Sequence, residues 1–176
     1  MNELIPYDLS ELKIVVADES RFMRQLVAAV LTGLRAPHPF VANSSDVALR
    51  LVAETKPDLL IVDWDLRPMR GIELVRRLRD ERSSPKPTIP IVMMTVHCAL
   101  DRVTEARDAG VNEFIAKPIS IDAIYKRIVA LIERPRPFIR LKSYFGPDRR
   151  RKIEEFAGDE RRLAEPDLVM LSAGAA

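Results

Sequence analysis

The sequence predicts a doubly wound α/β fold, in which helices cover both faces of a parallel sheet. Between residues 13 and 132, short apolar runs alternate five times with helix-forming segments, the pattern of consecutive βαβ units. The most apolar run, residues 59–62, consists of four aliphatic residues followed directly by Asp63. Such a run is typical of a central strand buried on both faces. We therefore expect five parallel strands joined by right-handed crossovers.

The five expected strands are short and aliphatic. They span residues 13–17, 40–42, 59–63, 91–94 and 113–116. The second is the shortest and has the weakest pattern. An ionised carboxylate is costly to bury, so Asp63 is expected at the carboxyl end of the third strand. In open α/β sheets this edge is where ligands bind.

The expected helices follow the strands and have capping residues at their ends. Ser20 caps the first helix, whose apolar residues recur every four positions, which predicts a stripe facing the core. The stripe consists of Phe22, Leu26, Val30 and Leu34. The next helices are expected at 43–55, 72–78 and 102–109, the last of these closing at Gly110. Ser120 or Asp122 caps the fifth helix, which runs to about Leu131.

Composition favours a cytoplasmic protein with no membrane contact. Hydrophobic residues make up 47% of the 176 residues, and no run reaches the roughly 20 apolar residues that cross a bilayer. Residues 1–12 carry acids and no basic segment, so we expect no secretory signal. The single cysteine, Cys98, excludes an intrachain disulfide. We divide the chain into a lead (1–12), one domain (13–132) and a C-terminal extension (133–176).

Four of the five strands end in side chains with useful chemistry. They are Asp18 with Glu19, Asp63, Thr95 and Lys117. In a parallel sheet these ends lie on one edge, so the residues are expected to converge. Three carboxylates together repel one another unless a cation lies among them, and a partly hydrated Mg²⁺ suits oxygen ligands. With the hydroxyl and the ammonium, this set can accept a phosphoryl group on a nucleophilic carboxylate.

Residues 13–132 resemble a response-regulator receiver domain of the CheY-like kind. The segments that carry the resemblance are IVVADESRFMR, PDLLIVDW, IVMMT and FIAKPI, in this order along the chain. The resemblance implies the flavodoxin-like (βα)5 fold with strand order 2-1-3-4-5. It implies a two-component response regulator that is a phosphoacceptor and no enzyme. The phosphoryl group would come from a histidine kinase or histidine phosphotransferase.

The resemblance also assigns roles to individual residues. Asp63 is the phosphoacceptor, and Asp18, Glu19, Asp63 and the backbone carbonyl of Asp65 hold Mg²⁺. Lys117 pairs with the phosphoryl group, and the Lys117–Pro118 peptide bond is cis. Thr95 moves toward the phosphate, and Phe114 turns inward with it. Glu19 departs from the family pattern, which has a second Asp there, and the common proline after the acceptor is displaced from position 67, which is Arg, to Pro68.

Two other interpretations of the site compete with this one. Asp63-Trp64-Asp65 is similar to the DxD nucleophile motif of haloacid-dehalogenase-like phosphatases, which would make the protein an enzyme. Against this, the motif follows the third strand, and no segment is available for a cap domain. The second alternative is a receiver-like adaptor that works without phosphorylation and whose input is a nucleotide bound to the extension.

The extension is rich in arginine and proline. Between Arg134 and Lys152, Asp148 is the only acid. Arginine can pair with phosphate and with guanine, and its flat face stacks on bases. The extension resembles arginine-rich extensions of CheY-like effectors that bind cyclic di-GMP. The candidate ligand residues are Arg136, Tyr144, Asp148, Arg149, Arg150 and Arg151.

The extension also has interpretations that involve no specific small-molecule ligand. Its composition is typical of a solvated, partly disordered basic tail, and it could instead contact nucleic acid or an acidic protein. About forty residues are too few for an ordinary output domain, so we do not expect DNA binding. Signalling is instead expected through protein contact, for example with a flagellar motor switch component or with a second receiver in a dimer.

Overall fold

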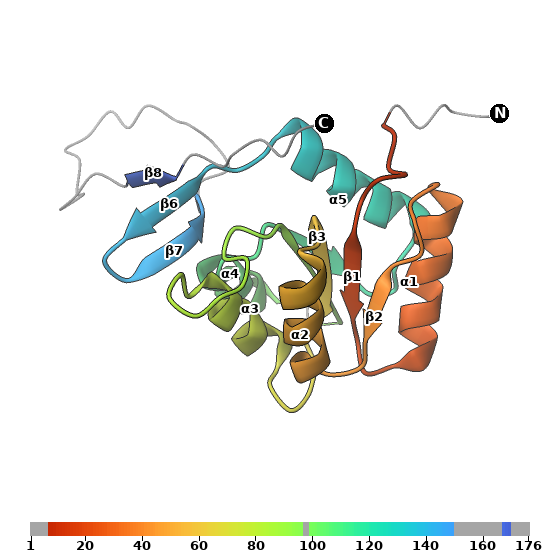
Figure 1. Cartoon of the computed structure of the whole chain (residues 1–176), viewed down its shortest axis with the longest axis horizontal. Helices are drawn as coiled ribbons and strands as arrows, with labels where there is room; N and C mark the ends of the chain where they lie inside the picture. Colours follow the sequence, from red (N-terminus) through yellow and green to blue (C-terminus); the bar gives the residue numbers. More distant parts are fainter. Residues whose placement is uncertain (1–6, 97–98, 150–166, 170–176) are drawn as a thin grey trace.

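The computed structural model describes residues 7–96 and 99–149, and the backbone of residues 167–169. Its central sheet has five parallel strands in the order β2-β1-β3-β4-β5. The strands are β1 (Ile14–Ala17), β2 (Phe40–Ala42), β3 (Leu59–Asp63), β4 (Ile91–Thr95) and β5 (Glu113–Ala116). The flavodoxin-like order predicted from the sequence is confirmed, with β3 at the centre as expected (Figure 1).

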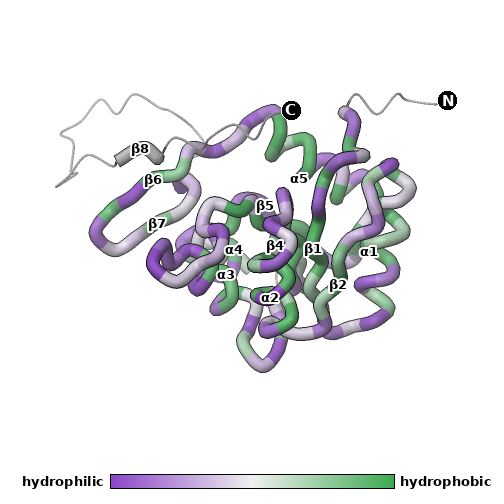
Figure 2. Tube along the Cα trace, in the orientation of Figure 1, coloured by the Kyte–Doolittle hydropathy of each residue, from purple (hydrophilic) through white to green (hydrophobic). Residues whose placement is uncertain are grey.

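Five helices cover the two faces of this sheet. They are α1 (Arg21–Gly33), α2 (Ser45–Thr55), α3 (Gly71–Arg79), α4 (Leu100–Ala109) and α5 (Ile121–Glu133). Alternate strand residues point to opposite faces: Leu60 and Val62 pack with α2, α3 and α4, whereas Leu59 and Ile61 pack with α1 and α5. Hydrophobic residues accordingly fill the sheet, while hydrophilic residues recur along the outer helices (Figure 2). Among the described residues, every helix is too short or too polar to cross a membrane.

Side-chain caps fix where several helices begin. The Ser20 hydroxyl accepts a hydrogen bond from the Met23 backbone N–H at 3.3 Å. The Ser120 hydroxyl accepts one from the Ala123 N–H at 3.1 Å, so Ser120 rather than Asp122 caps α5. Gly110 ends α4 with φ of 98°, a left-handed conformation that glycine adopts without steric cost. These caps place the first turns of α1 and α5 beside the carboxyl edge of the sheet.

The predicted core stripe of α1 is wrong at Phe22. This side chain is 70% exposed, whereas Val27 and Leu31 are fully buried. A spacing of four residues advances about 400° around a helix of 3.6 residues per turn, so the stripe drifts by about 40° at each step. Val30 and Leu34 still reach the core, but the drift carries Phe22 out to solvent.

The extension contains strands that the sequence did not predict. A hairpin of β6 (Phe138–Leu141) and β7 (Tyr144–Pro147) pairs with β8 (Asp167–Val169) in an antiparallel sheet of order β7-β6-β8. In Figure 1 the hairpin lies beside α3 and α4, on the opposite side of the molecule from α1.

The hairpin is anchored on a buried arginine at the end of α3. Phe138 is 1% exposed, and the guanidinium carbon of Arg79 lies 5.1 Å from the centre of its ring. Arg79 also donates hydrogen bonds to the Gly110 and Pro87 carbonyls and to Asn112 Oδ1. Burial lowers the pKa of Arg79 to about 9, so the side chain is still a cation at neutral pH. Residues 138–149 are therefore a packed element, not a solvated tail.

Candidate functional site

Four of the predicted site residues meet at the carboxyl edge of the central sheet. Asp18 follows β1, Asp63 and Thr95 end β3 and β4, and Lys117 follows β5. The strand register brings them level, because Asp63 pairs with Met94, next to Thr95. The Lys117 N–H in turn donates to the Thr95 carbonyl at 2.7 Å. Residues separated by up to 99 positions in the sequence thus share one small volume.

Lys117 holds the two acidic groups together. Its Nζ lies 2.9 Å from Asp18 Oδ2 and 2.9 Å from Asp63 Oδ1. Asp18 is 1% exposed and Asp63 is 7% exposed, so little water reaches either carboxylate. The remaining Asp18 oxygen, Oδ1, accepts a hydrogen bond from the Ser20 N–H at 2.8 Å. Two nearly buried negative charges therefore share one ammonium group.

The pKa values of this pair shift for opposing reasons. Burial raises the pKa of the Asp63 carboxyl, and the nearby Asp18 adds to the rise, while the hydrogen bond from Lys117 offsets part of it. Burial alone would lower the pKa of Lys117, but its hydrogen bonds to Asp63 and Asp18 outweigh that, so its pKa is raised. The two carboxylates thus favour the charged ammonium, and its hydrogen bond to Asp63 opposes the rise in the pKa of that carboxyl.

The acidic edge has the donor atoms that Mg²⁺ requires. Within residues 7–96 and 99–149, no three acidic, histidine or cysteine side chains converge into a ready-formed metal cluster. Asp18 and Asp63 already face a common cation, however, and the carboxylate of the exposed Glu19 lies 3.9 Å from Arg67, measured between Oε1 and Nε. Asp65 follows β3 and is exposed. Two nearly buried carboxylates beside two exposed acids are hard oxygen donors, which suit a partly hydrated Mg²⁺.

The two predicted switch residues lie on neighbouring strands. Thr95 is fully buried at the end of β4. Phe114 lies on β5, paired in register with Met93, and packs against the core cluster that includes residues of α3 and α4. The Lys117–Pro118 peptide bond is cis, and so is the Arg67–Pro68 bond, which the sequence analysis did not foresee.

Sequence reasoning missed two residues that shape the site. Arg24 donates from Nη1 to the backbone carbonyls of Asp18 at 2.6 Å and of Glu19 at 2.9 Å, which fixes the loop bearing both acids. A side chain at Gly71 would place its Cβ 1.9 Å from the Asp63 carbonyl oxygen, so only glycine fits there. In the sequence, the only indication that Arg24 shapes the site is its position one turn after the Ser20 cap. For Gly71 the sequence indicates only that a helix begins there.

The candidate ligand residues of the extension that the structure describes lie elsewhere, on the hairpin and on the segments that flank it. The guanidinium carbon of Arg149 lies 4.2 Å from the centre of the Tyr144 ring, and Arg149 Nη1 pairs with Asp108 Oδ1 at 3.2 Å. Arg136 donates to the Asp148 carbonyl. Arg150 and Arg151 lie outside the described residues. The structure thus separates the extension residues from the acidic edge.

Replacing Lys117 with Met is expected to destabilise the fold by about 1–3 kcal/mol, the range for a lost hydrogen bond to a charged group. Solvent still reaches this lysine, which places the value toward the lower end. Without the ammonium, Asp18 and Asp63 repel each other, so added Mg²⁺ should restore part of the loss. Urea titrations with EDTA and with Mg²⁺ measure both effects. Lys126→Met, at an exposed α5 lysine, is the control, and an equal loss in both variants would contradict the bridging role.

Comparisons with known proteins agree with this geometry. Residues 14–129 match the response regulator receiver domain family. The chemotaxis protein CheY of Pseudomonas aeruginosa is 31% identical over 124 residues, covering 70% of this chain and 98% of that protein. The phosphate regulon transcriptional regulatory protein PhoB of the same species is 30% identical over 124 residues, which cover 70% of this chain and 53% of that protein.

Solved structures show the same fold. The receiver domain of the Francisella response regulator 1452 superposes with a TM-score of 0.64 at 23% identity, covering 70% of this chain and 98% of that one. A putative response regulator from Chloroflexus aurantiacus also gives 0.64, at 25% identity and with the same coverage. Strand order, family match and sequence identity point the same way. The chain therefore belongs to the response regulator receiver family and is a CheY-like receiver domain of two-component signalling, followed by an extension.

Proposed function

We propose that the protein accepts a phosphoryl group on Asp63 from the phosphohistidine of a histidine kinase or histidine phosphotransferase. The observation that carries this proposal is the Lys117 bridge, which holds two nearly buried carboxylates within 2.9 Å of one ammonium at the carboxyl edge of the sheet. An Asp63 oxygen attacks phosphorus as the phosphorus–nitrogen bond to the imidazole breaks. The product is an acyl phosphate, and the bonding electrons leave with the imidazole.

The chain's own residues would position and stabilise the transferred group. When Asp63 takes up the phosphoryl group, Lys117 can leave its carboxylate and pair with a phosphoryl oxygen, while the Thr95 hydroxyl donates to another. Bound Mg²⁺, held by Asp18, Glu19, Asp63 and the Asp65 carbonyl, would supply charge neutralisation on the phosphoryl oxygens. Arg24 would keep the Asp18 loop in place through its two carbonyl contacts.

Output would pass through the surface of α4, β5 and α5. Phosphorylation shifts the population of receiver conformers, with Thr95 and Phe114 as the residues that move. The partner would be a protein, such as a flagellar motor switch component, a histidine phosphotransferase or a second receiver.

Phosphorylation of Asp63 is tested by incubating the protein with acetyl phosphate and Mg²⁺ and measuring the mass of the intact protein. Chelation of the metal with EDTA should prevent it. Unchanged mass with both acetyl phosphate and a cognate kinase would favour the phosphorylation-independent adaptor.

A second proposal concerns the extension, whose ligand we infer to be cyclic di-GMP. The supporting observation is that Arg136 donates a hydrogen bond to the Asp148 carbonyl at the open end of the hairpin, and that the Arg149 guanidinium is stacked on the Tyr144 ring. Two guanidinium groups offer pairing for phosphates and guanine edges, and the Asp148 carboxylate offers an acceptor for guanine N–H groups.

Arg149→Ala is expected to weaken cyclic di-GMP binding about tenfold, the equivalent of one lost charged hydrogen bond. Isothermal titration calorimetry with the full chain measures it. Arg50→Ala, which removes an exposed arginine on α2, should leave the affinity unchanged. Absence of heat with wild-type protein at tens of micromolar ligand, or equal affinity in the two variants, would reject this ligand.

A further inference from the structure

The loop between β3 and α3 holds an arginine, Arg67, at the carboxyl edge of the sheet. The Arg67 carbonyl accepts a hydrogen bond from the Ser45 N–H at 2.9 Å. Residues on either side of it are also anchored, since Leu66 is fully buried and the Met69 N–H donates to the Ser45 hydroxyl at 3.1 Å. Because Ser45 begins α2, the loop is fixed to that helix. The side chain of Arg67 therefore starts from a defined place beside β3.

From this anchored backbone the side chain of Arg67 extends toward Glu19. The distance from Arg67 Nε to Glu19 Oε1 is 3.9 Å, and the two side chains are 88% and 41% exposed. An ion pair at this distance and exposure is weak. The backbone that carries Glu19 is fixed as well, because Arg24 donates to the carbonyls of Asp18 and Glu19. The contact between Arg67 and Glu19 can therefore form or break through side-chain movement alone.

The acidic side chains proposed to hold Mg²⁺ thus already lie beside basic side chains. Lys117 bridges Asp18 and Asp63 at 2.9 Å, and Arg67 lies beside Glu19. The two bases differ in exposure, because the Lys117 side chain is 15% exposed and the Arg67 side chain 88%. A guanidinium that is mostly in water loses little when it leaves a weak ion pair. Arg67 is therefore the base that can return to water when a metal takes its carboxylate.

Two cations at the Glu19 carboxylate would repel each other, and water reduces this repulsion without removing it. We propose that Arg67 is a resident counter-ion of Glu19 that competes with Mg²⁺ and so raises the metal concentration at which the acceptor site fills. Both positions depart from the receiver pattern, and the structure brings the two departures side by side. The inference rests on the proposed phosphoacceptor function, which assigns Glu19 to the metal.

Titration of the full chain with Mg²⁺, followed by tryptophan fluorescence, tests the competition. Trp64 is the single tryptophan of the sequence, is 2% exposed and directly follows Asp63, so its emission reports on the acceptor site. Arg67→Ala is expected to lower the Mg²⁺ Kd at least about threefold, because the ion pair and the repulsion between the two cations are both removed. Arg67→Lys keeps the charge and should bind within about twofold of wild type.

The matched control is Arg70→Ala, on the same loop. The side chain of Arg70 is 53% exposed, and its guanidinium pairs with Glu73 of α3 at 3.1 Å. This variant removes the same charge without touching the Glu19 contact, so its Mg²⁺ Kd should stay within about twofold of wild type. An equal fall in Arg67→Ala and Arg70→Ala would mean that net charge alone sets the affinity, and it would overturn the inference.

Two further measurements distinguish competition from a structural effect of Arg67. In a Glu19→Gln background the attracting charge is gone while an oxygen donor remains, so Arg67→Ala should change the Kd by less than about twofold. Salt at about 1 M, where the Debye length is about 3 Å, should likewise shrink the difference between Arg67→Ala and wild type. An effect of undiminished size under either condition overturns the competition.

The outcomes keep this inference apart from the phosphoacceptor function. A wild-type Kd in Arg67→Ala overturns the inference, and phosphorylation of Asp63 in the same preparation leaves the proposed function standing. If Arg67→Ala binds Mg²⁺ more tightly while Asp63 takes up no phosphoryl group, the competition stands and the proposed function fails. Absence of Mg²⁺ binding by wild type at tens of millimolar counts against both. In phosphorylation by acetyl phosphate, the half-saturating Mg²⁺ concentration should fall by the same factor as the Kd, and an unchanged value contradicts the inference.

Discussion

Replacing Asp63 with Asn is expected to abolish uptake of a phosphoryl group from acetyl phosphate or from a histidine kinase. The carboxylate of Asp63 is the nucleophile, and a neutral amide cannot form the acyl phosphate. The change is nearly isosteric, and the Asn oxygen can still accept from Lys117, which lies 2.9 Å from Asp63 Oδ1. The fold should therefore persist while the chemistry is lost. Intact-protein mass spectrometry should show the added phosphoryl group in wild type and none in the variant.

The matched control for this experiment is Asp65→Asn. Asp65 is two residues further along and exposed, and only its backbone carbonyl is proposed to hold the metal, so the variant should still be phosphorylated. Phosphorylation of Asp63→Asn to the wild-type level would mean that another residue is the acceptor. Since some receivers refuse acetyl phosphate, a phosphorylated kinase domain should serve as the second donor before a negative result with wild type is accepted.

The carboxyl-edge site was foreseeable because its geometry follows from topology. Once the chain is interpreted as five parallel βα units, the residues that end β1, β3, β4 and β5 must lie along one edge. Asp18, Asp63, Thr95 and Lys117 could therefore be grouped before any coordinates. What topology does not give is the hydrogen bonding: the Lys117 bridge and the Arg24 contacts depend on side-chain reach within the folded loops.

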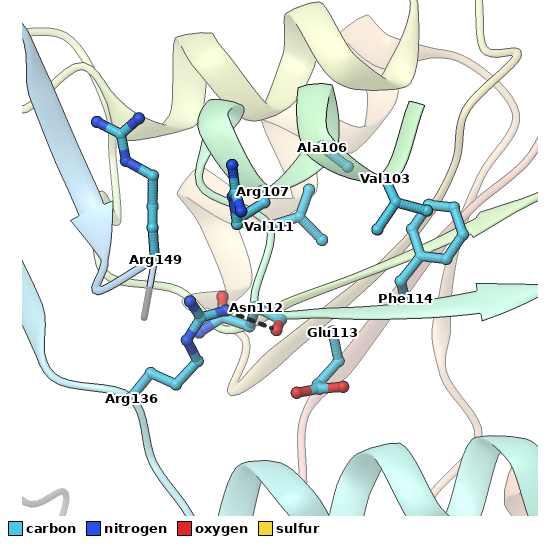
Figure 3. A pocket seen from close by; sticks show the side chains of 9 residues that line it. All are labelled: Val103, Ala106, Arg107, Val111, Asn112, Glu113, Phe114, Arg136 and Arg149. Atoms are coloured by element: carbon cyan, nitrogen blue, oxygen red, sulfur yellow. Dashed lines mark hydrogen bonds between the residues drawn. The ribbon is translucent and has the colours of Figure 1, made fainter. Parts of the chain in front are cut away.

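The extension could not be derived in the same way. Its arginines and prolines have the composition of a solvated tail, and composition carries no information about a specific anchor. The anchor is Arg79, which sequence reasoning would place on a solvated face of α3 because arginine is rarely buried. It is buried here because three acceptors and the Phe138 ring surround it. The pocket that Arg136 and Arg149 help to line beside α4 and β5 (Figure 3) depends on this docking, so the sequence did not predict it either.

Replacing Phe138 with Ala is expected to lower the free energy of unfolding by about 3–5 kcal/mol, the usual range for truncating a buried aromatic side chain. Phe138 is 1% exposed, covers the Arg79 guanidinium and lies 5.7 Å from the Phe145 ring, measured between ring centres. Its loss would leave a cavity beside a buried cation. Phe22→Ala is the control, because that ring is 70% exposed and surface substitutions usually change stability by less than about 0.5 kcal/mol.

The loss of stability can appear in global unfolding or in undocking of the hairpin alone, and the measurement must distinguish these two events. If the hairpin and the receiver unfold together, urea denaturation shows the full loss in one transition. If the hairpin undocks first, the loss in the main transition is limited to the free energy of docking, and proteolysis within residues 138–149 becomes faster while the receiver stays intact. Stability and protease resistance equal to those of Phe22→Ala would show that Phe138 does not anchor the extension.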